Sequence, residues 1–200
     1  MSVLVFIQTG LSIILFLSLQ GCLNAAMTGA QAFYNRHSIQ QNLDDQYITM
    51  QAYQALKMNS DRFKDANISI ATYNNEVLLA GQVPHVWQKM EAKRIIKHIP
   101  DVEHVYDSIA IASPSSTLTR MSDTWITAKI KAKLITSAEV DATKVKVVTE
   151  NGTVYLMGIL PIEEAKAAIT VASTTDGVAK VVNLFSYIKI LRSSIFFKKY

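Results

Sequence analysis

The sequence has 200 residues, half of them hydrophobic, with only 7 Gly and 4 Pro, which is enough for one ordinary domain or two small ones. This composition excludes disorder of the whole chain, and the single cysteine excludes an internal disulfide. The formal net charge is +4, and residues 114–200 carry the cationic excess, with 12 Lys/Arg against 7 Asp/Glu. Such a basic half fits nucleic acid, an acidic partner or an anionic membrane, and charge alone does not choose among them.

The chain begins with a hydrophobic leader. Residues 3–19 are almost purely apolar and hold no charged side chain, and the only cysteine, Cys22, follows directly after Leu19-Gln20-Gly21. This order resembles the lipobox of bacterial lipoproteins, so we expect residues 1–21 to be a signal peptide and Cys22 to carry diacylglyceryl and acyl groups. By the same resemblance, Leu23 favours sorting to the outer membrane. A transmembrane anchor with a free cysteine is the alternative.

An internal repeat organises the rest of the chain. Residues 68–81 align without gaps onto residues 145–158, and flanking segments align at nearly the same offset. The identical pairs are Thr72/Thr149, Asn74/Asn151, Val77/Val154, Leu79/Leu156, Gly81/Gly158 and Pro84/Pro161. A repeat of this length indicates two copies of one structural module.

Each copy predicts the order helix, strand, strand, helix, strand. First helices are expected at residues 44–58 and 123–137, with Asp45 in one copy and Ser122 or Asp123 in the other available as N-caps. The first two strands are joined by a polar turn, for which Asn-Gly in the second copy is the strongest hairpin signal of the chain.

The second helix of each copy is expected to begin at Pro84 or Pro161, where a missing backbone N–H costs little. It leads to a third strand that pairs in parallel, because a helical crossover joins it to the sheet. We therefore predict an α+β fold in which two helices pack on a small three-stranded mixed sheet, twice over. The expected segments are a signal peptide at 1–21, the acylated cysteine and a tether at 22–43, domains at 44–112 and 122–190 with a linker at 113–121, and a tail at 191–200.

The duplicated module resembles the BON domain. The residues that carry the resemblance are Ser122-Asp-Thr-Trp-Ile-Thr, the hairpin from Thr149 to Gly158, Glu164-Ala-Lys-Ala-Ala168 and the Leu-Gln-Gly-Cys22 leader end. Over about residues 17–190 the chain is similar to outer-membrane lipoproteins with two tandem BON domains. That resemblance implies a non-enzymatic, periplasm-facing lipoprotein that supports envelope integrity, localises to envelope regions such as the division site, and binds anionic phospholipid through the first helix of the second domain.

The predicted helix 123–137 has two apolar faces, which is one more than packing requires. Its core stripe is Ile126, Ile130 and Leu134, and the first copy has apolar residues at the equivalent positions. The opposite face holds Trp125, Ala128, Ala132 and Ile135, flanked by Lys129 and Lys133 on one side and by Lys131 on the other. The first copy carries the more polar set Tyr47, Met50, Gln54 and Lys57 there.

This second face predicts a binding surface, with a membrane, a protein and the neighbouring domain as its possible occupants. Burial in the core of its own domain is the alternative. An anionic bilayer, such as one containing phosphatidylglycerol or cardiolipin, suits a Trp and an Ile ringed by lysines. An envelope protein partner that uses the same face is the alternative. We expect no enzyme activity, metal site, noncovalent cofactor or nucleic-acid partner, because His37, His85, His98 and His104 have no metal-ligand or nucleophile-base spacing and no phosphate loop is present.

Overall fold

The computed structural model describes the backbone of residues 29–188 and the side chains of residues 41–188. The predicted signal peptide, the acylation site Cys22 and the predicted tail at 191–200 lie outside the described residues. Among the helices of residues 29–188, none is both long and apolar enough to cross a membrane. The described part contains two successive domains with the same element order, which confirms the predicted α+β class and αββαβ order.

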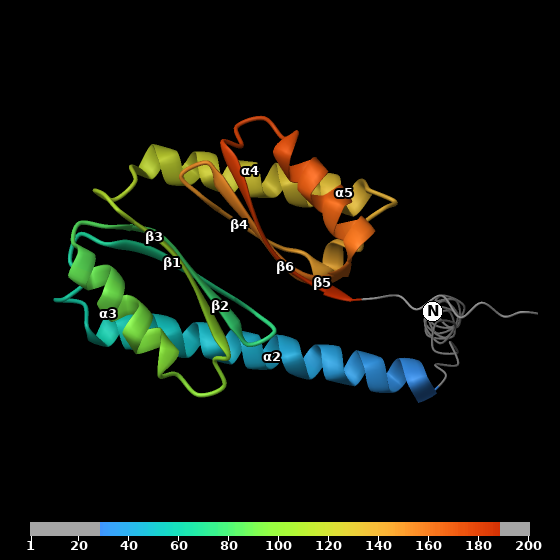
Figure 1. Cartoon of the computed structure of the whole chain (residues 1–200), viewed down its shortest axis with the longest axis horizontal. Coiled ribbons are helices and arrows are strands. Elements are labelled where there is room, and N and C mark those ends of the chain that lie inside the picture. The colour runs from blue at the N-terminus through green and yellow to red at the C-terminus, as the bar shows by residue number, and fades with distance from the viewer. Residues whose placement is uncertain (1–28, 189–200) are drawn as a thin grey trace, which may run out of the picture. The chain divides into compact units, whose positions relative to one another are not determined.

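The first domain runs from α2 to β3, and the second from α4 to β6 (Figure 1). The elements of the first are α2 (Gly29–Met58), β1 (Asn67–Tyr73), β2 (Glu76–Val83), α3 (Val86–Lys97) and β3 (His104–Ile111). Those of the second are α4 (Thr117–Thr136), the 3-10 helix η2 (Ala142–Lys144), β4 (Lys146–Glu150), β5 (Thr153–Pro161), α5 (Ile162–Ser173) and β6 (Lys180–Ile188).

Each domain has a three-stranded mixed sheet whose central strand is the second one. The strand orders are β1-β2-β3 and β4-β5-β6. The first pair in each sheet is antiparallel, and the third strand joins it in parallel, as predicted from the helical crossover. In the second domain the hairpin turn has positive φ at Asn151 (49°) and Gly152 (70°), as a type I′ turn requires. Asn74 and Asn75 adopt the same backbone region in the first domain.

Two helices cover one face of each sheet and enclose the core (Figure 1). In the second domain the core stripe of α4 is Ile126, Ile130 and Leu134, all at most 4% exposed, as predicted from the sequence. It packs on alternate residues of β4 and β5 together with the alanines of α5. The first domain buries Ile48, Ala52 and Leu56 of α2 in the same way.

A buried aspartate in each first helix binds the hairpin turn of its own domain, which corrects its predicted role as an N-cap. The carboxylate of Asp123 accepts the backbone N–H groups of Asn151 (2.8 Å) and Gly152 (2.9 Å). Asp45 accepts those of Asn74 and Asn75 at 2.8 and 2.9 Å. The sequence pattern could not reveal this role, because the partner lies some thirty residues away in the chain.

A threonine pair accompanies the aspartate in both domains. The hydroxyl of Thr49 donates to Thr72 at 2.8 Å, and that of Thr127 donates to Thr149 at 2.7 Å. Both contacts join the first helix to the first strand of the sheet. The repeated Asp and Thr therefore anchor the first helix to the hairpin, which explains why these residues recur in both copies.

Both first helices begin earlier than predicted. α2 starts at Gly29 and not at residue 44, so part of the expected tether 22–43 is helical. This segment is rich in Ala and Gln and contains no proline, so nothing in it stops the helix. α4 starts at Thr117 and not at residue 123, which shortens the expected linker 113–121.

The sheet faces that the helices leave uncovered share a third apolar cluster. It contains Ala71, Leu78 and Ala80 of the first domain and Tyr155 and Met157 of the second. Along β2 and β5 these residues alternate with the core residues, as the two faces of a strand require.

Two charged side chains, the buried Glu150 and the half-buried Lys146, add polar contacts between the domains. Glu150 accepts from Asn67 and Ser69, both at 2.7 Å, and Lys146 donates to the backbone oxygen of Thr72 at 2.7 Å. Burial lowers the pKa of the Lys146 ammonium below its ordinary value. The acceptor oxygen at 2.7 Å compensates part of that desolvation.

Candidate functional site

The outer face of α4 carries an apolar stripe along nearly the whole helix. Its members follow the spacing 3, 4, 3, 4, 3, which keeps them on one side of an α-helix. They are Leu118, Met121, Trp125, Ala128, Ala132 and Ile135, and all six are exposed. The large side chains among them lie between 65% and 76% exposed. Its ends are 17 positions apart in the sequence, so the stripe spans about 25 Å.

Leu118 and Met121 were missed by the sequence prediction because the helix was expected to start at residue 123. The structure places the N-cap at Ser116, whose hydroxyl accepts the backbone N–H of Thr119 at 3.1 Å. Ser116 followed by Thr119 is itself a cap signal, and Pro114 just before it marks the end of the linker. Those residues could have given the correct start and the longer stripe.

The exposed charges of α4 all have one sign. Its single carboxylate, Asp123, is 5% exposed and already binds the hairpin turn. The remaining charged side chains of the helix are Arg120, Lys129, Lys131 and Lys133. The apolar stripe is therefore flanked by cations alone, which favours an anionic surface.

The structure also shows how the predicted lysines are held. Lys129 donates to the backbone oxygen of Asp176 at 2.5 Å, and Lys133 donates to the hydroxyl of Thr175 at 3.1 Å. Both acceptors lie in the loop between α5 and β6 and are uncharged groups. Their dipoles orient the two ammonium groups without neutralising them, so the charges remain available to an anionic ligand.

Lys131 lies on the other flank of α4, at a shallow cavity near the C-terminal end of the helix. The cavity is also lined by Leu134, Ile135, Ala142 and Val145. Its walls are mainly aliphatic, and Lys131 supplies the charge at its edge. The arrangement places a hydrophobic recess beside a cation, next to the end of the exposed stripe.

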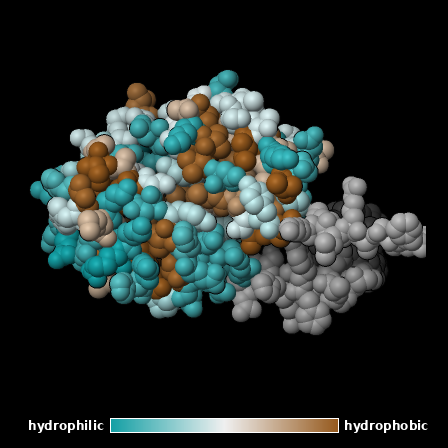
Figure 2. All heavy atoms as spheres, viewed as in Figure 1, coloured by the Kyte–Doolittle hydropathy of each residue, from teal (hydrophilic) through white to brown (hydrophobic). Residues whose placement is uncertain are grey.

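The first domain does not cover this face. Its sheet packs on the sheet of the second domain through the shared cluster at Tyr155 and Met157, whereas Trp125 remains 66% exposed. The first domain is therefore excluded as the occupant of the outer face of α4. On the side of the molecule drawn in Figure 2, apolar surface is divided into several patches among hydrophilic residues.

The equivalent face of α2 differs in its charge. Leu43, Tyr47 and Met50 are exposed there, at positions that correspond to the stripe of α4. However, among residues 41–58 of α2, whose side chains the structure describes, Lys57 is the only cation, and Asp44 exposes its carboxylate. The two first helices thus share exposed apolar residues, and only α4 surrounds them with positive charge.

Comparison with known proteins gives a consistent family. The BON domain family matches residues 44–113 and 122–189. The chain is 31% identical over 174 residues to "Outer membrane lipoprotein DolP" of Haemophilus influenzae, which covers 85% of this chain and 90% of that protein. It is 35% identical over 147 residues to "21 kDa hemolysin" of Actinobacillus pleuropneumoniae, with 74% and 76% covered. It is 33% identical over 144 residues to "Osmotically-inducible protein Y" of Escherichia coli, with 70% and 71% covered.

Proposed function

This chain belongs to the BON domain family, with two BON domains that follow one another, and on that premise we propose that it is an outer-membrane lipoprotein that contacts anionic phospholipid through α4. The observation that carries the proposal is the exposed apolar stripe of α4, which is flanked only by positively charged residues of that helix. The similarity to an outer-membrane lipoprotein over most of both chains supports the location and a role in the cell envelope.

The stripe suits the boundary between headgroups and acyl chains. Trp125 has an amphipathic ring that favours the headgroup level, and Leu118, Met121 and Ile135 are long enough to reach below it. The ammonium groups of the lysines can extend along the helix to lipid phosphates. The protein needs no pocket for this ligand, because a bilayer adapts to the convex surface of a helix.

The expected affinity is modest. Each cation near an anionic surface contributes on the order of 1 kcal/mol, so the four cations of α4 give weak and reversible attraction. An acyl anchor at Cys22 would hold α4 close to the bilayer and raise the effective lipid concentration without any new contact. The anchor and the helix are therefore two contributions to one membrane contact.

A protein adaptor is the second candidate function. The spacing 3, 4, 3, 4, 3 of the stripe is also that of a helix that packs on another helix. In this case the partner would be a helix of an envelope protein or α4 of another copy. Binding would then depend on the partner's shape and not on the lipid composition.

A vesicle experiment separates the two candidates. The chain from residue 23 onward, which omits the leader and the acylation site, is sedimented with vesicles of phosphatidylcholine alone or mixed with phosphatidylglycerol. We expect binding only to the anionic vesicles, and Trp125→Glu should weaken it about tenfold or more, since it removes the ring and adds a repulsive charge. Tyr47→Glu, at the equivalent position of α2, is the matched control and should leave binding nearly unchanged.

Binding that ignores phosphatidylglycerol, or that survives Trp125→Glu, would refute the lipid proposal. Self-association in analytical ultracentrifugation that is lost in Trp125→Glu and unaffected by lipid would favour the adaptor. The anchor is tested separately in the full chain. Cys22→Ala should abolish the incorporation of labelled fatty acid and release the protein from the membrane fraction. Continued tight membrane retention would indicate an uncleaved span instead of an acyl anchor.

A further inference from the structure

The outer face of α3 in the first domain carries exposed apolar residues that its own domain does not use. The core side of α3 is formed by Gln88, Ala92 and Ile96. Opposite to it, Val86, Trp87 and Met90 are 59%, 49% and 67% exposed. Trp87 stacks on the ring of His85, the N-cap residue, and otherwise faces outward.

The corresponding helix of the second domain lacks these residues. The identical prolines Pro84 and Pro161 align the two helices, and the alignment places Val86 and Trp87 opposite Glu163 and Glu164. One repeat thus has an apolar pair at the position where the other has two carboxylates. The requirements of the shared fold cannot explain Trp87, because α5 packs on its sheet without an aromatic residue there.

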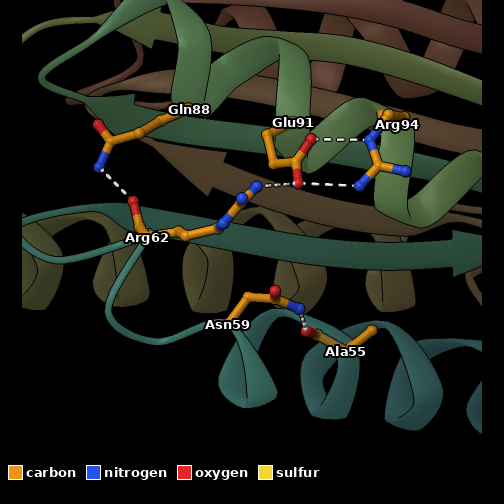
Figure 3. A network of polar contacts seen from close by, with 6 residues as sticks. All are labelled: Ala55, Asn59, Arg62, Gln88, Glu91 and Arg94. Atoms are coloured by element: carbon orange, nitrogen blue, oxygen red, sulfur yellow. Dashed lines mark hydrogen bonds and ion pairs between the residues drawn. The ribbon is translucent and has the colours of Figure 1, made fainter.

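The charges around α3 are predominantly positive. The helix contains Lys89, Lys93, Arg94 and Lys97 against a single carboxylate, Glu91. Figure 3 shows that Glu91 lies between two guanidinium groups. Arg94 donates to it at 2.7 and 2.9 Å, and Arg62 donates at 2.6 Å.

The charged residues on and around α3 keep a net positive charge after these contacts are formed. The hydrogen bonds from Arg94, followed by the charges of both arginines, hold the pKa of Glu91 near 2, so it is ionised and its charge is offset. Lys89 and Lys93 approach Asp107 of β3 at 3.5 and 3.9 Å. Four cations therefore pair with two carboxylates, and with Lys97 of the same helix the group has a net charge of +3.

The apolar and cationic residues share one side of the helix. At 100° per residue, Val86, Met90, Lys93 and Lys97 fall within about 60° of one another, and Trp87 and Arg94 lie next to them. The apolar residues occupy the N-terminal half of this face and the cations the C-terminal half. A shallowly inserted Trp and Met with lysines that extend to phosphates is an arrangement for the surface of an anionic bilayer.

We propose that the outer face of α3, formed by Val86, Trp87, Met90, Lys93, Arg94 and Lys97, is a second contact for an anionic bilayer, separate from α4 and in the other domain. The excess of positive charge and the convex, aromatic-containing face select a lipid surface as the occupant. In this proposal each domain contacts lipid with a different helix, the first domain with its second helix and the second domain with its first.

The chain has two tryptophans, one on each proposed face, so single-tryptophan variants report on each face by itself. Trp125→Phe leaves Trp87 as the only tryptophan, and Trp87→Phe leaves Trp125. The full-length variants are reconstituted with vesicles of phosphatidylcholine alone or mixed with phosphatidylglycerol. Indole emission and quenching by acrylamide are then measured. The signal is local to one ring, so attachment through other parts of the chain does not by itself produce it.

In Trp125→Phe we expect a blue shift of the Trp87 emission and a quenching constant that falls to about half in anionic vesicles, because one side of the ring becomes shielded at the headgroup level. Adding Lys97→Glu should reduce both changes, whereas Lys166→Glu on α5 should not. Circular dichroism checks that each variant is folded.

If the emission and quenching of Trp87 are the same in both kinds of vesicle, the proposal is wrong, and an acidic protein becomes the better occupant. This result is distinguishable from a failure of the function proposed for α4. A response of Trp125 without one of Trp87 supports α4 and overturns the inference. A response of Trp87 without one of Trp125 supports the inference and refutes the role of α4.

Discussion

The two domains share their internal contacts and differ in the surfaces of their helices. Both bind the hairpin turn with a buried aspartate from the first helix, and both join helix and sheet by a pair of threonine hydroxyls. Their outer faces have diverged, since α4 has a cationic rim around Trp125 and α2 does not, while α3 exposes Trp87 and α5 has carboxylates instead. The comparison separates residues retained by the fold from residues available for binding.

The largest effect should come from removing the shared aspartate. Asp123→Ala deletes the acceptor of two backbone N–H groups, and hydrogen bonds to a charged group contribute roughly 1.5 to 3 kcal/mol each, so we expect a loss of about 3 kcal/mol in the free energy of unfolding. Asp45→Ala should have a similar effect through the first domain. Urea denaturation followed by circular dichroism measures both.

The exposed Asp61 provides a control, and Asp61→Ala should change the free energy of unfolding by less than about 0.5 kcal/mol. If Asp123→Ala is as mild as this control, the aspartate does not hold the hairpin. If only one of the two substitutions, Asp45→Ala or Asp123→Ala, lowers the free energy of unfolding strongly, the two aspartates do not have equivalent roles in their domains.

The next prediction concerns Gly81 and Gly158, which occupy the same position in the two domains but should differ in how much their substitution destabilises the fold. A Cβ on Gly81 would lie 2.1 Å from the backbone oxygen of Asn67, and its φ of +117° disfavours any L side chain. A Cβ on Gly158 would lie 2.4 Å from the backbone oxygen of Lys144, without the conformational penalty. We expect Gly81→Ala to cost about 3 kcal/mol and Gly158→Ala about 2, as measured by thermal and urea unfolding. The reverse order would contradict the added backbone strain at Gly81.

The repeat explains how much of the fold could be predicted. The αββαβ order, the parallel third strand and the core stripes follow from local periodicity and from the identical residues of the two copies. The starts of α2 and α4 did not follow, because Asp45 and Asp123 resemble N-caps locally but bind a turn that is distant in sequence. A capping pattern carries no information about such a long-range contact.

The candidate site was predictable where the repeat offered a comparison. Trp125 and its lysines stood out because the first copy has other residues at these positions. Leu118 and Met121 lie before the predicted helix start and were therefore missed. The face of α3 was missed for a different reason. Trp87 and Met90 stand among charged residues in the sequence, and only the burial of Gln88, Ala92 and Ile96 reveals which side of that helix is outward.

A smaller effect tests the difference in charge between the first helices. Lys131→Glu replaces a positive charge beside the stripe of α4 by a negative one, a change of two charge units. At about 1 kcal/mol per charge, the binding free energy to anionic vesicles weakens by about 2 kcal/mol, so the affinity falls roughly 30-fold. Lys57→Glu on α2 has the same change in net charge and is the control. We expect it to weaken binding only slightly, because Lys57 is the only cation among residues 41–58 of α2. Equal losses in vesicle sedimentation would mean that net charge alone, and not the face of α4, determines binding.

The smallest effect concerns how the stability of the first domain depends on pH. It arises from the contact of Glu91 with two guanidinium groups, which α5 of the second domain does not have. Arg94 and Arg62 lower the pKa of Glu91 from 4.5 to about 2, so Glu91 stabilises the folded state above pH 4.5 and loses that contribution as the pH falls through this range to about 2. Glu91→Gln should therefore show a weaker loss of stability between pH 4.5 and 2 than the wild type in urea titrations. Arg94→Gln should remove more of this pH dependence than Arg62→Gln, because the hydrogen bond from Arg94 is the largest cause of the shift. Equal pH profiles for Glu91→Gln and the wild type would show that the two guanidinium groups do not hold this carboxylate, and that its negative charge remains exposed on the face of α3.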